Sequence, residues 1–177
     1  MTVKKKIIWL TIFSIAMGFM ETVIVVYLRK LYYPDGFDFP LVTMDMEILK
    51  AEFLREAATV IMLLGIGILT GKTAAQKFAY FIFSFAIWDI FYYVFLKMLL
   101  DWPASICTWD ILFLIPLPWV GPVLAPCIVS LTMIILAIGI VYYEEKGYDM
   151  CIKSKDWLML ITGSVIVILS FVTDALQ

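Results

Sequence analysis

Residues 7–28 read IIWLTIFSIAMGFMETVIVVYL and contain a single charged residue, Glu21. An α-helix rises about 1.5 Å per residue, so these 22 residues can cross the hydrocarbon core of a bilayer, which is about 30 Å thick. Three lysines, Lys4–Lys6, precede the stretch. Because it is long, contains a carboxylate and lacks a small-residue cleavage site, it predicts a retained first transmembrane helix and not a signal peptide.

The whole chain shares this apolar character. Of its 177 residues, 64% are hydrophobic and 16% are charged, against roughly 25% charged residues in soluble domains. A soluble domain of this size could not bury so much apolar surface, whereas a lipid bilayer solvates it. The sequence therefore predicts an all-α, polytopic membrane helix bundle formed by one domain, residues 1–177. A net charge of −2 gives no reason to expect a nucleic-acid partner.

Five apolar stretches predict about five transmembrane helices. We expect them at about residues 7–28, 51–70, 78–100, 121–143 and 157–173. The apolar run at 57–70 has only 14 residues, too few to span a bilayer, so this helix must extend back to Ala51. That extension places Glu52, Arg55 and Glu56 in the outer part of the membrane.

A proline-rich segment precedes the fourth predicted helix. The apolar run at 111–141 has 31 residues, too many for one simple span, and its first half contains Pro116, Pro118, Pro122 and Pro126. Proline lacks the backbone N–H of a helix and clashes with the preceding turn. We therefore expect an irregular or re-entrant segment over Ile111 to Trp119, with the helix starting near Gly121.

The distribution of lysine and arginine indicates the orientation. If the N-terminus is cytoplasmic, eight of the 13 Lys and Arg residues lie on the cytoplasmic side and five on the outer side. Cytoplasmic loops carry an excess of these residues. The sequence therefore predicts a multi-pass protein of the cell (cytoplasmic) membrane with a cytoplasmic N-terminus, although Arg29 and Lys30 lie close to the first helix on the outer side.

The sequence gives no support for a bound metal or cofactor. Without histidine, the chain lacks the usual haem ligand and the common catalytic zinc ligands. Its three cysteines, Cys107, Cys127 and Cys151, form no close-spaced pair, and the predicted topology separates Cys107 from Cys151 across the membrane. We therefore expect neither a disulfide nor a zinc site.

Charged side chains within a bilayer are costly, and they usually face a cavity or a partner. Counted from the outer helix ends, several ionisable residues of three helices fall at similar depths in the outer half of the membrane. We therefore predict a ligand-binding pocket open to the outside and built from Glu21, Arg55, Glu56, Asp89, Tyr92, Tyr93 and Lys97. Asp89 lies deepest and is its strongest candidate.

Three functions are compatible with such a pocket. The first is a binding or transport component, in which Arg55 meets an anionic group and Glu21 and Asp89 bind a cation or relay protons. Five helices are few for alternating access, so a homo-oligomer or a larger membrane complex is then expected. The second is an accessory or assembly subunit whose charged cluster only joins helices. The third, a small enzyme using Asp89 or Glu56 as general acid or base, has the least support.

Overall fold

The fold is a bundle of long helices. The computed structural model describes residues 2–37, 41–115, 117–148, 150 and 152–175. The helices in this part are α1 (Val3–Tyr32), α2 (Met46–Thr70), α3 (Ala74–Leu100), α4 (Leu124–Glu145) and α5 (Ser154–Ala175). These five are long and apolar enough to cross a membrane. The predicted helical, multi-pass architecture is thus confirmed, while the side on which the N-terminus lies stays a prediction.

The first three helices begin four or five residues earlier than predicted, and polar residues outside the apolar stretches cap two of them, α2 and α3. The side chain of Asp45 accepts a hydrogen bond from the Glu47 N–H at the start of α2, 2.8 Å apart. At the start of α3, Thr73 Oγ1 accepts a hydrogen bond from the Gln76 N–H at 3.0 Å. Such caps satisfy backbone donors that the first turn of a helix leaves unpaired, so the helix can begin before its apolar part.

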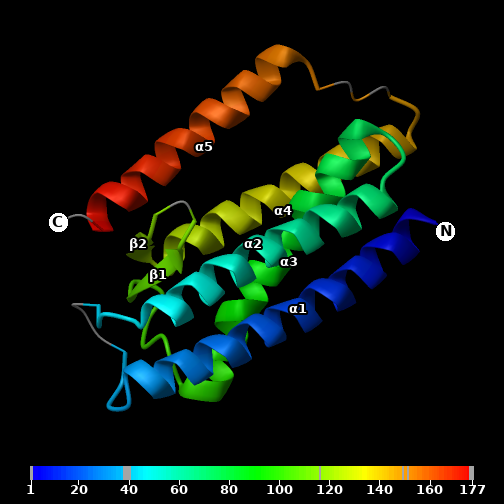
Figure 1. Cartoon of the computed structure of the whole chain (residues 1–177). Coiled ribbons are helices and arrows are strands. Elements are labelled where there is room, and N and C mark those ends of the chain that lie inside the picture. Colours follow the sequence, from blue (N-terminus) through cyan, green and yellow to red (C-terminus); the bar gives the residue numbers. More distant parts are fainter. Residues whose placement is uncertain (1, 38–40, 116, 149, 151, 176–177) are drawn as a thin grey trace.

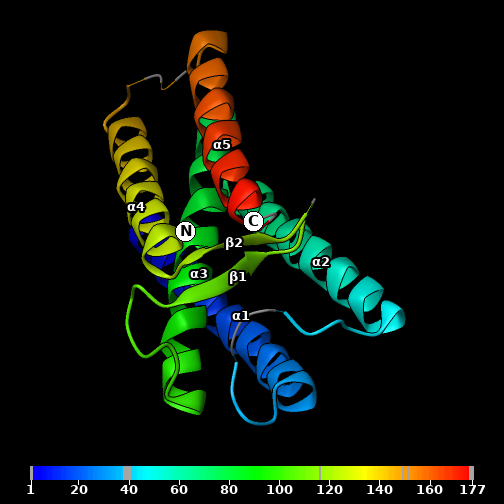
Figure 2. The same cartoon turned by 90° about the vertical axis from the view of Figure 1, so that its left-hand side faces the viewer.

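Helix α3 is the centre of the bundle and packs against α1, α2 and α4. Figure 2 shows it between α4 and α2. Two glycines allow its neighbours to approach closely. A Cβ on Gly18 of α1 would lie 2.9 Å from the Trp88 carbonyl oxygen, and one on Gly67 of α2 would lie 2.8 Å from the Phe81 nitrogen. Small residues permit such backbone approach at helix interfaces in membranes.

A short β-hairpin stands where the sequence predicted an irregular segment. Strands β1 (Trp109–Phe113) and β2 (Trp119–Pro122) pair antiparallel between α3 and α4. Pro122 lies at the end of its strand, where a missing N–H is tolerated. The fourth helix begins at Leu124, three residues later than expected. Pro116 lies outside the described residues, and re-entry of this segment into the membrane stays a prediction.

Helix α5 lies to one side of the other four (Figure 1). None of its most apolar 18-residue window is buried in the structure. It contacts the hairpin through β2, where the rings of Trp119 and Phe171 stack 6.5 Å apart. At its other end, the rings of Phe78 and Trp157 meet edge to face at 5.0 Å. Its long sides therefore face lipid or another chain.

Two of the cysteines are described, and both are free thiols: Cys107 is exposed and Cys127 is partly buried. Cys151, the third, lies outside the described residues.

We predict that Gly67→Ala destabilises the protein by about 1–3 kcal/mol, because the added methyl group overlaps backbone atoms of α3. Gly65→Ala is the matched control on the same helix, since a Cβ there meets no described atom within 4 Å. This control should stabilise the protein by no more than about 1 kcal/mol, because alanine favours a helix more than glycine does. Thermal unfolding of the purified variants in detergent measures both. Equal effects of the two substitutions would contradict the close α2–α3 contact.

Candidate functional site

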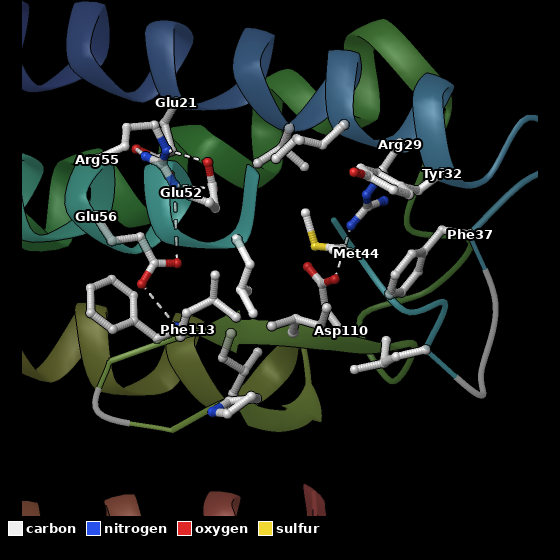
Figure 3. Close-up of a pocket in the computed structure, with 18 of the residues that line it drawn as sticks. Glu21, Arg29, Tyr32, Phe37, Met44, Glu52, Arg55, Glu56, Asp110 and Phe113 are labelled. Carbon is white, nitrogen blue, oxygen red and sulfur yellow. Dashed lines mark hydrogen bonds and ion pairs between the residues drawn. The ribbon is translucent and has the colours of Figure 1, made fainter. Parts of the chain in front are cut away.

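A cavity of about 420 Å³ opens at the hairpin end of the bundle. It lies between the C-terminal half of α1 and the N-terminal half of α2, and α3 and β1 complete its walls. Residues 41–44, which precede α2, form part of its rim. Figure 3 shows two groups of charged side chains in it, one around Arg55 and one around Arg29.

The first group is the Arg55 cluster, which consists of Arg55, Glu21, Glu52 and Glu56. Arg55 forms an ion pair with Glu21 of α1, and its Nε donates to Glu52 Oε2 at 2.9 Å. Its Nη2 also lies 4.0 Å from Glu56 Oε1. Positions 52, 55 and 56 share one helical face because they are three and four residues apart. The three carboxylates are all buried, so the cluster joins α1 to α2 away from solvent.

Glu56 also connects the cluster to the hairpin. The Leu114 N–H, just after β1, donates a hydrogen bond to Glu56 Oε2 at 2.9 Å. The hydroxyl of Thr59, one turn further along α2, donates a hydrogen bond to Glu21 Oε2 at 3.4 Å. The carboxylates are therefore positioned from three elements, α1, α2 and the hairpin.

The charges of the Arg55 cluster do not balance. Within the described residues, its three carboxylates form ion pairs with one guanidinium alone. Excess negative charge in a buried site is unfavourable unless a cation or a proton compensates it. The arrangement is consequently suited to a positively charged group that comes from outside the described chain.

The second group is a buried ion pair between Arg29 at the end of α1 and Asp110 on β1, with nitrogen and oxygen 2.9 Å apart. The Arg29 guanidinium also lies against two rings, 4.4 Å from the centre of Phe37 and 3.7 Å from that of Trp102. Burial raises the pKa of Asp110 to about 6, while the Arg29 charge acts in the opposite direction. The pair therefore fixes the hairpin to α1.

Arg29 and Asp110 were not among the site residues predicted from the sequence. Arg29 counted only as a positive charge on the unexpected side of the membrane. The sequence did hold a hint of their pairing. Arg29 lies at the end of an apolar helix and Asp110 next to an apolar run, and charges in such places need a partner. Their approach across 81 positions depends on the hairpin, which the sequence did not predict.

Of the seven predicted residues, five line the same cavity: Glu21, Arg55, Glu56, Asp89 and Tyr92. Asp89 of α3 accepts a hydrogen bond from Ser130 Oγ of α4 at 2.7 Å. The other two, Tyr93 and Lys97, are not among the residues that line the cavity in the described part of the chain. Tyr93 packs in a buried cluster with Val26, Leu96 and Val123. The Lys97 side chain is 51% exposed and pairs with Asp101.

Arg55 is the shared ion-pair partner of Glu21, Glu52 and Glu56. No group of three or more His, Cys, Asp or Glu residues suited to a metal is found among the described residues.

Comparison of the chain with protein-family models, with curated proteins and with solved structures finds no match in any of the three. The geometry and charge of the cavity are consequently the basis for assigning a function.

We predict that Arg55→Gln destabilises the protein by about 3–5 kcal/mol, because it leaves three buried carboxylates without their cation. Lys50→Gln, at an exposed position of the same helix, is the control and should have little effect. Replacing Glu21 and Glu52 by Gln together with Arg55→Gln should restore much of the lost stability, since it removes two of the three unpaired charges. Thermal unfolding and folded yield in detergent measure these changes. A stable Arg55→Gln single variant would show that the cluster does not hold α1 and α2 together.

Proposed function

We propose that this chain is a binding or transport component of the cell membrane, and that its cavity holds a small amphiphile carrying an amine. The observation that supports this most is the excess of buried carboxylates over arginine in the Arg55 cluster, inside a cavity with apolar walls. The excess of lysine on the other side of the bundle supports a cavity open to the non-cytoplasmic side.

The charge of the cavity selects for a cation. Its described lining includes five carboxylates and two guanidiniums. An ammonium group has three N–H donors and no acceptor, so it can bind several of these oxygens at once. Hydrogen bonds to charged groups in a buried site are stronger than neutral ones. An anionic ligand would add to the negative charge and is disfavoured.

The walls of the cavity select for an apolar chain. Aliphatic side chains of α1, α2 and β1 lie between the two charged groups: Val25, Leu28, Leu49, Ile111 and Leu112. The volume of about 420 Å³ falls in the range of about 300–1,000 Å³ typical of small-molecule sites. A ligand with one ammonium group and a short apolar chain is complementary to both features.

A second candidate, an accessory subunit of a larger complex, is favoured by helix α5. None of the apolar window of this helix is buried against the rest of the described chain, so a partner helix could pack along it. In that case the Arg55 cluster would only join α1 to α2. Changes to its charge would then alter stability without altering the binding of any ligand.

We predict that octylamine stabilises the purified protein against thermal unfolding, while octanol and octanoate do so less. Glu56→Gln should weaken octylamine binding about tenfold, because it removes one negative charge, while the amide oxygen can still accept from the Leu114 N–H. Glu47→Gln on the exposed start of α2 is the matched control and should leave binding unchanged. If octanoate binds as well as octylamine, or if none of the three binds, the amine site is wrong.

Asp89 provides a second test at the site. Asp89→Asn should fold normally, because the asparagine oxygen can accept the hydrogen bond from Ser130. It should weaken octylamine binding by about threefold to tenfold, since one charge of the lining is lost. Calorimetric titration and thermal unfolding, compared with the unchanged protein, separate the two effects. If neither stability nor binding changes, Asp89 has no part in the site.

A further inference from the structure

We infer that the ligand is bipolar, with an amine bound at the Arg55 cluster and a hydroxyl or amide group bound between Arg29 and Asp110. This inference rests on the proposed amine site and extends it to the other end of the same cavity. The chemical class is a short chain with an amine at one end and a neutral group that both donates and accepts hydrogen bonds at the other, such as an amino alcohol.

The first support is a pair of unsatisfied atoms. Among the described residues, Arg29 Nη1 and Asp110 Oδ2 are buried and have no hydrogen-bond partner. The two side chains are only 9% and 2% exposed. Nearly all buried polar groups in proteins are hydrogen-bonded, so this donor and this acceptor are available to a ligand group that reaches them.

The second support is the position of these atoms. Arg29 and Asp110 line the same cavity as the Arg55 cluster. Figure 3 shows Asp110 directed from β1 towards Arg29, on the opposite side of the cavity from Glu21. Arg29 and Glu21 both belong to α1, eight residues and thus about 12 Å apart along its axis. One elongated molecule can therefore reach both charged groups, with its chain along the aliphatic wall between them.

The third support comes from the chemistry of the pair. A carboxylate would bind Arg29 but would be repelled by Asp110. An ammonium group would bind Asp110 but would be repelled by Arg29. A hydroxyl donates one hydrogen bond and accepts others, and an amide does the same, so either group satisfies both atoms without adding charge. A ligand with two polar ends is a soluble molecule and not a bilayer lipid, whose apolar tail must remain free.

The unpaired atoms of Arg29 and Asp110 have almost no exposed surface, so a neighbouring side chain must move to admit a ligand. Met44 lies beside Asp110 and lines the cavity (Figure 3). Methionine is unbranched and flexible, so it can move at little cost. The segment that carries Met44 is held in place on both sides: the Val42 N–H donates to the Tyr33 hydroxyl at 2.8 Å, and the Asp45 N–H donates to the Tyr32 hydroxyl at 3.2 Å.

The test compares ligands that differ only at their far end. Full-length protein in nanodiscs is titrated with octylamine and with three relatives that carry a terminal hydroxyl, carboxylate or second amine. We expect the amino alcohol to bind about tenfold more tightly than octylamine, and the other two no more tightly than octylamine. Transfer from water favours octylamine, the most apolar ligand, so partition alone would give the opposite order.

The outcomes separate the two proposals. If octylamine binds and the amino alcohol binds no more tightly, the bipolar ligand is wrong and the amine site stands. If no amine binds, both are wrong. Arg29→Lys, which keeps the charge but has one nitrogen in place of three, should reduce the advantage of the amino alcohol over octylamine to about twofold or less. Glu56→Gln should weaken both ligands equally. If Arg29→Lys does not fold, the comparison of ligands on the unchanged protein still decides.

Discussion

The contact between Arg55 and the carboxylates of two helices is the interaction on which the site depends. Helices α1 and α2 pack mainly against α3 and make few contacts with each other. The ion pair between Arg55 and Glu21 joins them directly, and the bond from Leu114 to Glu56 adds the hairpin. In a bilayer, polar contacts of this kind replace the hydrophobic force that packs helices in water. The same contact leaves negative charge uncompensated, so a feature that joins α1 to α2 also carries the charge on which the proposed amine site rests.

The close helix contacts and the cavity lie in different parts of the bundle. Gly18, in the middle of α1, and Gly67, near the end of α2, bring these helices close to α3. Towards the hairpin, α1 and α2 carry bulky and charged residues, and the cavity lies between them. The hairpin closes this space from the side through the pair between Arg29 and Asp110. The cavity thus lies at the end of the bundle where these two close contacts are absent.

The helices were predictable from the sequence because membrane spans require long apolar runs, and one such run, residues 7–28, is unmistakable. Helix starts were less predictable, since caps such as Asp45 depend on local hydrogen bonds. Most of the candidate site followed from one rule, that buried charges need partners, applied to residues such as Glu21 and Arg55. The pairing of Arg29 with Asp110 could not be predicted from this rule. The rule says that each charge needs a partner, but not that a hairpin brings Asp110 to the end of α1.

Helix α5 differs from the other four in what determines its position. It touches the bundle near its ends and leaves its long sides to the surroundings. A helix held in this way can change its tilt with the thickness of the hydrocarbon layer, whereas α3 packs against three neighbours. Since α5 contacts β2, and β2 pairs with β1, which lines the cavity, the hairpin links this outer helix to the wall of the site.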